Sequence, residues 1–467
     1  MDEPLLADYY RSTFPAGALA WLATRRGDAL DQREWAAEGA YYKRYVVGAT
    51  AGALRKELLM VPQLASVHIG PVYSGRVSRS GKGGGTLEDY SRPHRRELVF
   101  DVDLTDFPFL KEQLTPQPGG PVDLEACDRA WPVAGLALFF LKYMLCEHLG
   151  FTEFLCVYSG RRGAHLWVLD ERAMVLTEEG RAAVASFVNL RAAPSNGVRA
   201  SGEQRKLMNT YDLTDAVVYS FESVLVEGMG LLDDIGARDA FVAALGLSSH
   251  ESMHNLADEA SRKETGAEAW QYIKAKVESQ AKRNAKACGW FVERLQETVL
   301  GYVWPRIDLN VTKGLNHLIK APFVAHPKTQ RIAMPIDGQG LLTFRPAEVP
   351  TLGTASMAGL APFGGEAGAQ ALRGYVVHQQ PTPAHAPPQQ QQQPSARPPS
   401  TKRKAPPPGP APPPTPRPPM TDDNGVFDME DLALADRRSP TPMRARPPGY
   451  PVRKSFAPRP SPLGPNR

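Results

Sequence analysis

The chain has 467 residues, 42% of them hydrophobic, which is enough to bury at least one large core. Its net charge of +4 comes from residues 381–467, which hold 13 Lys and Arg against 6 Asp and Glu and 26 of the 44 prolines. The rest of the chain has no excess of basic residues, so any binding of a polyanion there would depend on local patches. No signal-peptide hydrophobic region and no apolar run near 18 residues occurs, and we therefore expect neither a secreted nor a membrane-spanning protein.

The first predicted strand that carries chemistry lies at 97–104. The first sixty residues indicate mainly helices, with short strands near 32–35 and in the tyrosine-rich run that follows. In 97–104 the side chains alternate, so Asp101 and Asp103 share one face while apolar residues bury on the other. Adjacent like charges are costly unless a cation lies between them, and a divalent metal is the usual occupant. A single pair of this kind is also common at surface ion-pair sites, so the pattern alone leaves both interpretations open.

A hairpin with a basic tip follows. Residues 133–149 suit a buried helix, and 154–158 and 164–170 suit two strands joined by a glycine-bracketed turn. The donors at the turn are Ser159, the amides of Gly160 and Gly163, Arg161 and Arg162. Guanidinium groups match phosphate oxygens bidentately, so the tip is a candidate phosphate-binding site. His165, in the returning strand, is by itself typical of a packed core histidine.

The next part of the chain predicts helices and then a third acid. Residues 171–300 show little β alternation, which indicates a helical subdomain inserted between catalytic strands. A further strand is predicted at 305–311, where Arg306, Asp308 and Asn310 share one face. Asp308 is a natural third ligand beside the first two acids. Three carboxylates together with a phosphate-binding hairpin favour nucleotidyl transfer.

The C-terminal region has a different composition. We expect a core at 1–170 and 301–375, the helical insertion between them, and a disordered proline-rich tail at 376–467. Within the tail, residues 422–436 carry six acids among apolar residues and are interpreted either as an amphipathic helix that docks on a basic groove or as a solvated acidic stretch. The basic run at 402–404 resembles a short nuclear-import signal.

Three long motifs resemble the small catalytic subunit of eukaryotic-type DNA primase, in the archaeo-eukaryotic primase superfamily. They are ELVFDVDLTD at 97–106, VYSGRRGAH at 157–165 and RIDLNVTKGLNHL at 306–318. Shorter matches extend the agreement in order and spacing from about residue 5 to about residue 350, and several long motifs in register are highly specific. The resemblance implies an α+β primase fold, with a mixed β-sheet catalytic core flanked by helices.

The resemblance also implies the site. In the family, the acids that match Asp101, Asp103 and Asp308 are catalytic and hold two Mg²⁺ or Mn²⁺ ions. The residues that match the family's contacts to the incoming triphosphate are Arg44, Ser159, Arg161, Arg162, His165, Lys320 and His326. Glu34 and Tyr42 match positions near the active centre, and their roles are left open.

The chain departs from the family pattern in two places. Where the family carries a zinc module this chain has only Cys127, and the cysteines, at spacings of 19, 10 and 132, match no zinc motif. We expect no structural zinc and free thiols in a reducing compartment. The cysteines are Cys127, Cys146, Cys156 and Cys288. Before 69–70, Ser66 and His68 stand where the family tends to have a basic residue and an acid, which puts one substrate contact in doubt.

The resemblance implies a nuclear enzyme that makes short RNA primers on a single-stranded DNA template from ribonucleoside triphosphates, for replication initiation and lagging-strand synthesis. Its implied partners are a large primase subunit and the DNA polymerase alpha complex, and the tail would bind a replication-fork protein. Two alternatives are a primase-polymerase relative in damage tolerance and a catalytically silent scaffold. The closer motif match favours the primase, and the intact set of three acids argues against the scaffold.

Overall fold

The computed structural model describes residues 3–77, 92–115, 121–189, 213–353, 355–365 and 367–381. They belong to a unit that spans Met1–Gln391, and a second unit, Gln392–Arg467, lies outside the described residues. The tail interpretations at 402–404 and 422–436 therefore lie outside them too. Within the described residues two antiparallel sheets and many helices are present, which confirms the predicted α+β class.

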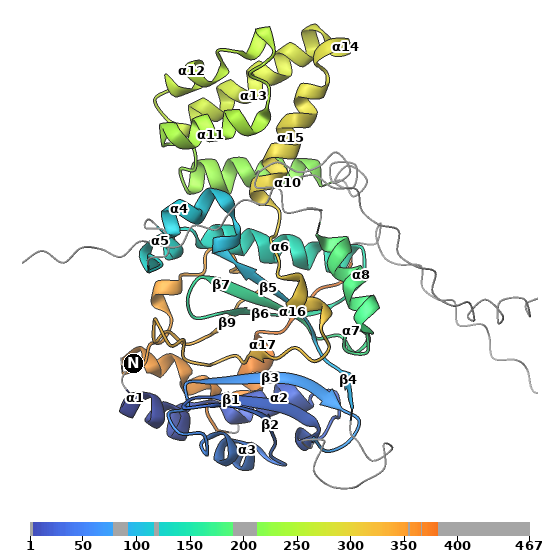
Figure 1. Ribbon diagram of the computed structural model, residues 1–467, viewed down its shortest axis with the longest axis vertical. Coiled ribbons are helices and arrows are strands. Elements are labelled where there is room, and N and C mark those ends of the chain that lie inside the picture. The colour runs from blue at the N-terminus through green and yellow to red at the C-terminus, as the bar shows by residue number, and fades with distance from the viewer. Residues whose placement is uncertain are drawn as a thin grey trace, which may run out of the picture. The chain divides into compact units, whose positions relative to one another are not determined.

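Sheet A is formed largely by the N-terminal part of the chain. Its strands run in the order β2-β1-β3-β4, and β8 also pairs with β3. They are β1 (Arg33–Glu38), β2 (Tyr42–Val46), β3 (Ser66–Tyr73), β4 (Pro93–Arg95) and β8 (Ile319–Lys320). The helices beside this sheet are α1 (Glu3–Asp8), α2 (Ala16–Thr24) and α3 (Ala51–Leu58) (Figure 1). Strands and helices in this part agree with the expectation from the sequence.

Sheet B carries the predicted catalytic strand and the hairpin. Its strands run in the order β10-β6-β7-β5, and β9 also pairs with β6. They are β5 (Leu98–Asp103), β6 (Glu153–Tyr158), β7 (Gly163–Val168), β9 (Pro335–Ile336) and β10 (Val377–His378). The helix α6 (Trp131–Glu147) packs on β5 and β7 and is apolar almost all round, because its other side is covered by further helices. The predicted strand, hairpin and buried helix are confirmed.

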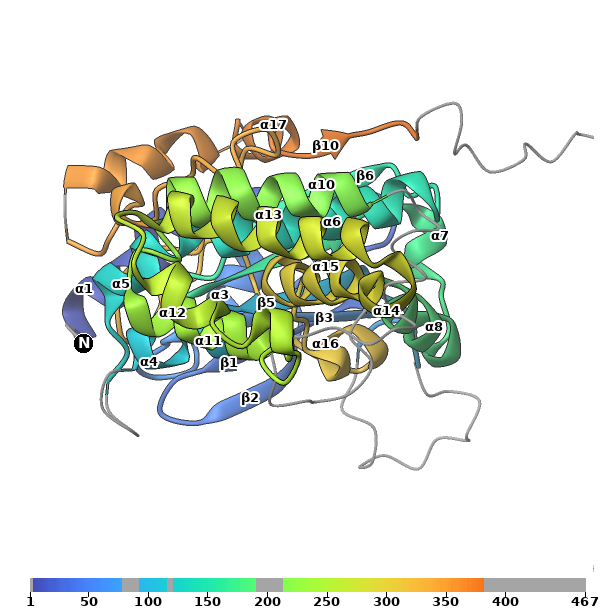
Figure 2. The ribbon, with the colours of Figure 1, turned by 90° about the horizontal axis from the view of Figure 1, so that it is seen from above.

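A cluster of helices stands on the side of α6 that faces away from sheet B (Figure 1), and its helices lie over α6 when seen from above (Figure 2). It contains α10 (Thr214–Ser220), α11 (Ile235–Leu245), α12 (Leu256–Ser261), α13 (Gly266–Arg283), α14 (Ala285–Cys288) and α15 (Trp290–Val303). Aromatic side chains pack together in its interior, such as Phe221 and Trp270, which meet edge to face with ring centroids 4.9 Å apart. The described parts of 171–300 contain helices and no strand, as the sequence indicated.

The remaining described α-helices flank the sheets. They are α4 (Lys111–Leu114), α5 (Leu124–Arg129), α7 (Glu171–Met174), α8 (Glu178–Val188), α16 (Leu309–Lys313) and α17 (Gly368–Gly374). Among the described residues, no helix has the length and apolarity needed to cross a membrane.

The segment from residue 308 to residue 336 connects the two sheets. The backbone N–H of Asp308 donates to the carbonyl of Asp101 in β5 at 3.1 Å. Lys320 then pairs with His68 in sheet A, and Pro335 returns to pair with Val157 in sheet B. Groups from this segment therefore face residues of both sheets.

Two sequence predictions, one for residues 305–311 and one for the C-terminal end of the fold, were wrong. The predicted strand at 305–311 is absent, because Asp308 caps the short helix α16: its Oδ1 accepts from the Asn310 N–H at 2.8 Å. The side chain of an N-cap aspartate accepts from the free backbone N–H groups of the first helical turn. The alternation of residue types over 305–311 gives no sign of this capping. The fold also continues past the predicted end at 375, since β10 adds an edge strand to β6.

Candidate active site

One cavity of about 170 Å³ gathers most of the residues that the sequence selected. Eight predicted side chains line it, together with Gly163. They are Asp101, Asp103, Ser159, Arg161, Arg162, His165, Lys320 and His326. The cavity lies at the turn between β6 and β7, where acids from β5 meet cations from the turn and from β8.

Strand register explains how the acids reach this cavity. In the β5–β7 ladder, Asp101 lies opposite His165, and Asp103 lies opposite Gly163 at the start of the turn. A Cβ on Gly163 would lie 2.4 Å from the Val102 carbonyl oxygen, so only glycine allows the turn to approach β5 this closely. Gly160 has φ of +90°, which favours glycine, and a Cβ on it would lie 2.8 Å from the Cβ of His326.

The acids lie close enough together to disfavour one another's charged form. Burial, then the charges of Asp103 and Asp308, raise the pKa of Asp101 to about 6. Burial and the same group of carboxylates raise the pKa of Asp106 to about 6 as well. Sequence reasoning gave Asp106 no role, although it ends the first motif. A cation beside such a group of carboxylates would favour their charged form.

The donor set fits a hard divalent ion, but it is not assembled as a closed cluster. Within the described residues, no three His, Cys, Asp or Glu side chains are gathered closely enough to form one. Asp103 instead accepts from the Arg162 Nε at 2.8 Å and from the Thr105 hydroxyl at 2.7 Å, and Asp308 caps α16. The available donors are carboxylate oxygens, which Mg²⁺ and Mn²⁺ prefer.

The two histidines are neutral imidazoles. Burial, then the ammonium of Lys320, lowers the pKa of His326 to about 3 and that of His165 to about 4. The Nδ1 of His326 accepts from the Lys328 backbone N–H at 3.2 Å, so the proton of the neutral ring is assigned to Nε2. His165 Nε2 lies 3.6 Å from Asp101 Oδ1. Both rings can donate a hydrogen bond without adding charge.

Four predicted residues are outside the residues that line this cavity: Asp308, which caps α16, and three residues on sheet A. Arg44 makes a two-pronged ion pair with Glu34, with Nε–Oε1 at 2.7 Å and Nη2–Oε2 at 3.1 Å. The Tyr73 hydroxyl also donates to Glu34 at 2.8 Å. Glu34 is fully buried, so it holds the orientation of the Arg44 guanidinium, which is one-third exposed. Tyr42 is exposed and its ring packs edge-on against His68.

Ser66 and His68, where the chain departs from the family pattern, lie in β3 of sheet A. His68 lies opposite Lys320 in the β3–β8 pairing, at the boundary of the cavity. Burial, then Lys320 and His317, lowers the pKa of His68 to about 4, so a neutral ring stands where the resemblance leads us to expect an acid. Ser66 is buried, and its hydroxyl has no hydrogen-bond partner among the described residues.

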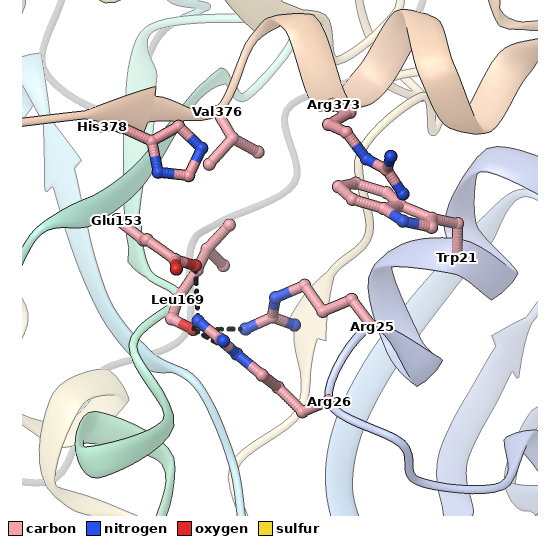
Figure 3. Close-up of a pocket in the computed structure, with 8 residues that line it drawn as sticks. All are labelled: Trp21, Arg25, Arg26, Glu153, Leu169, Arg373, Val376 and His378. Carbon is pink, nitrogen blue, oxygen red and sulfur yellow. Dashed lines mark hydrogen bonds and ion pairs between the residues drawn. The ribbon is translucent and has the colours of Figure 1, made fainter.

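A second cavity, of about 200 Å³, lies at the opposite end of the hairpin (Figure 3). Arg25 and Arg26 both donate there to the carbonyl of Leu169. Arg25 also pairs with Glu97 and Arg26 with Glu153, while Arg373 stacks on the Trp21 ring at 5.3 Å. Arg25 and Arg26 join the end of α2 to sheet B, and all three arginines have internal partners, so the candidate active site is the cavity at the hairpin tip.

All four cysteines are buried and free. Cys127 lies in α5, and burial, then Asp128, raises the pKa of its thiol to about 11. The absence of structural zinc stays a prediction.

A cavity in which carboxylates face guanidinium and ammonium groups is typical of proteins that act on phosphate esters. The family model of the DNA primase small subunit matches residues 100–337. The DNA primase small subunit of Drosophila melanogaster is 31% identical over 75% of this chain and 80% of the relative, and that of Schizosaccharomyces pombe is 28% identical over 75% and 77%. The DNA primase small subunit PriS of Thermococcus kodakarensis is 38% identical over 20% of this chain and 25% of the relative. The chain belongs to the DNA primase small-subunit family.

Proposed function

We propose that the chain is the catalytic subunit of a DNA primase, which joins ribonucleotides into short RNA primers on single-stranded DNA. The observation that carries this proposal is the cavity at the hairpin tip, where eight side chains selected from the sequence come together in a chain of this family. We further propose a large primase subunit and the DNA polymerase alpha complex as partners, a fork protein bound by the tail, and a nuclear location.

The hairpin tip binds the triphosphate in this proposal. Arg161 and Arg162 neutralise the phosphate oxygens, and the His326 Nε2–H donates a hydrogen bond without adding charge. The Ser159 hydroxyl accepts from the Gly163 N–H at 3.2 Å, which leaves its own O–H free to donate. Arg162 is held by Asp103 at 2.8 Å, so its transfer to a phosphate would free the Asp103 carboxylate.

The three aspartates would hold the ions. Asp101, Asp103 and Asp308 fit Mg²⁺ or Mn²⁺ because all their donors are carboxylate oxygens and because Asp103 and Asp308 place further negative charge beside Asp101. When bound, two such ions supply activation of the attacking 3′-hydroxyl and stabilisation of the leaving pyrophosphate. Lys320 adds a cation from the opposite sheet, where it lies across from His68.

Co-purification with the large subunit and a primer-synthesis assay test this function. Incubation with poly(dT) and ATP should yield short RNA products, and dATP should be a much poorer substrate. Long products made preferentially from dATP would instead indicate the primase-polymerase alternative. No product from a folded complex would indicate the silent scaffold.

Arg162→Ala should raise the KM for the nucleotide about 10- to 100-fold, because a charge-assisted phosphate contact is lost, and should lower kcat as well. The measurement is steady-state extension across a nucleotide titration. Arg129→Ala is the matched control, because Arg129 makes an exposed ion pair with Glu125 outside the cavity. Unchanged kinetics in Arg162→Ala would show that the arginine does not contribute to nucleotide binding.

A further inference from the structure

The helix that follows Asp308 is too short to hold its own orientation. α16 spans only Leu309–Lys313, and a helix of five residues is not stable by its internal hydrogen bonds. Its N-terminal end is tied to sheet B, because the Asp308 N–H donates to the Asp101 carbonyl at 3.1 Å. Its C-terminal end therefore needs a partner if the Asp308 carboxylate is to keep one position.

Arg96 is that partner. Its Nη1 donates to the carbonyls of Val311 at 3.0 Å and Gly314 at 2.9 Å. The carbonyls of the last helical turn have no N–H partner within the helix, so they accept hydrogen bonds from donors outside it. Arg96 is only 1% exposed, so water does not readily replace it.

Arg96 is itself fixed to the strand that carries the other two acids. It lies two residues before β5, and its backbone N–H donates to the Met174 carbonyl at 3.0 Å. Arg181 in α8 donates to the carbonyls of Arg96 and of Glu97. Two buried guanidinium groups thus connect β5, α8 and α16, and α16 packs on both of the other elements.

We propose that Arg96 is a positioning residue for Asp308. By joining the C-terminal turn of α16 to the start of β5, it keeps the Asp308 carboxylate beside Asp101. The inference rests on the proposed function, in which Asp308 holds a divalent ion. It assigns a task to a buried arginine that is not among the residues lining the cavity.

The test compares Arg96→Ala with Arg96→Lys. Mn²⁺ binding is measured by electron paramagnetic resonance without nucleotide, and primer extension is measured at steady state. Arg96→Ala should weaken Mn²⁺ binding and lower kcat about 10- to 100-fold. Losses of this size are typical when a residue that orients a metal ligand is removed. The KM for the nucleotide should change less than about twofold, because the hairpin tip is untouched. Arg96→Lys should recover most of the loss, since an ammonium can donate to both carbonyls.

Arg238→Ala is the matched control for general destabilisation. Arg238 is also buried, at 2% exposure, and donates to backbone carbonyls of Leu232 and Lys263 in the helical cluster. Its replacement should lower the thermal midpoint but leave Mn²⁺ affinity and kcat unchanged. If Arg96→Ala does not fold, Arg96→Gln is measured in its place. Its side chain is shorter than that of arginine and carries a single amide donor group, so it should show the same losses.

The possible failures are distinguishable. Normal Mn²⁺ affinity and kcat in the folded Arg96 variant would overturn the positioning role alone. Normal Mn²⁺ affinity and extension in Asp308→Asn would overturn the proposed role of Asp308 instead. Equal losses in Arg96→Ala and Arg238→Ala would mean that only general stability is involved.

Discussion

Replacing Asp308 by asparagine is expected to abolish primer extension while the chain stays folded. Asparagine keeps a side-chain oxygen that can cap α16, so the local fold is preserved, but the negative charge beside Asp101 is lost. Loss of one ligand removes several kcal/mol of transition-state stabilisation, which corresponds to about a thousandfold or more in rate. Extension assays across Mg²⁺ and Mn²⁺ titrations measure the effect, and Asp103→Asn should behave in the same way.

Asp234→Asn is the matched control. Asp234 also caps a helix, since its side chain accepts from the Ala237 N–H at 2.9 Å, but it lies in the helical cluster. This variant should extend primers at the normal rate. Near-normal extension by a folded Asp308→Asn would contradict the metal assignment, whereas equal losses in the two variants would point to capping.

Replacing Glu97 by alanine is expected to lower the free energy of unfolding by about 3–5 kcal/mol. Glu97 precedes β5 and its side chain is 1% exposed. It accepts from Arg33 in β1 at 2.8 and 2.9 Å and from Arg25 after α2 at 2.8 Å, so it ties sheet A to sheet B. Its loss leaves two buried guanidinium groups without a carboxylate. Urea denaturation followed by tryptophan fluorescence measures the change.

The same ion network predicts a pH dependence. Burial alone would raise the pKa of Glu97, but Arg33 and Arg25 outweigh it and hold the pKa well below its ordinary value of 4.5. The folded pKa is depressed, so this contribution to stability is present above the ordinary pKa and is lost as the pH falls through and below it. Glu97→Ala should therefore lose less stability than the wild type on acidification.

Glu125→Ala is the surface control for this prediction. Glu125 forms an exposed ion pair with Arg129, and such pairs contribute about 0–1 kcal/mol. An effect of Glu97→Ala no larger than that of Glu125→Ala would show that the network does not join the sheets energetically.

Local patterns were sufficient for the elements that carry most of the candidate site. The alternation around Asp101 predicted β5, and the glycines around Arg161 and Arg162 predicted the β6–β7 turn. Each pattern is enforced by neighbours in sequence, through strand periodicity or a positive φ, so it needs no knowledge of the rest of the chain.

Patterns that depend on distant partners were misjudged or missed. Asp308 was placed on a strand, although it caps a helix. The partnership of Glu34 with Arg44 and the roles of Glu97 and Arg96 were not anticipated, because their partners come from other elements. A buried charge in a sequence looks like any other charged residue until its counter-charge is known.

The sequence by itself determined the family resemblance, the acidic strand and the basic hairpin tip. These are short segments whose residue types and spacing already specify strand faces and turn geometry. Only the tertiary structure decided that Asp308 returns to Asp101, that Lys320 reaches the cavity from the other sheet, and that buried arginines hold these pieces together. The reason is physical: a carboxylate or guanidinium takes its task from the charges and carbonyls that surround it after folding.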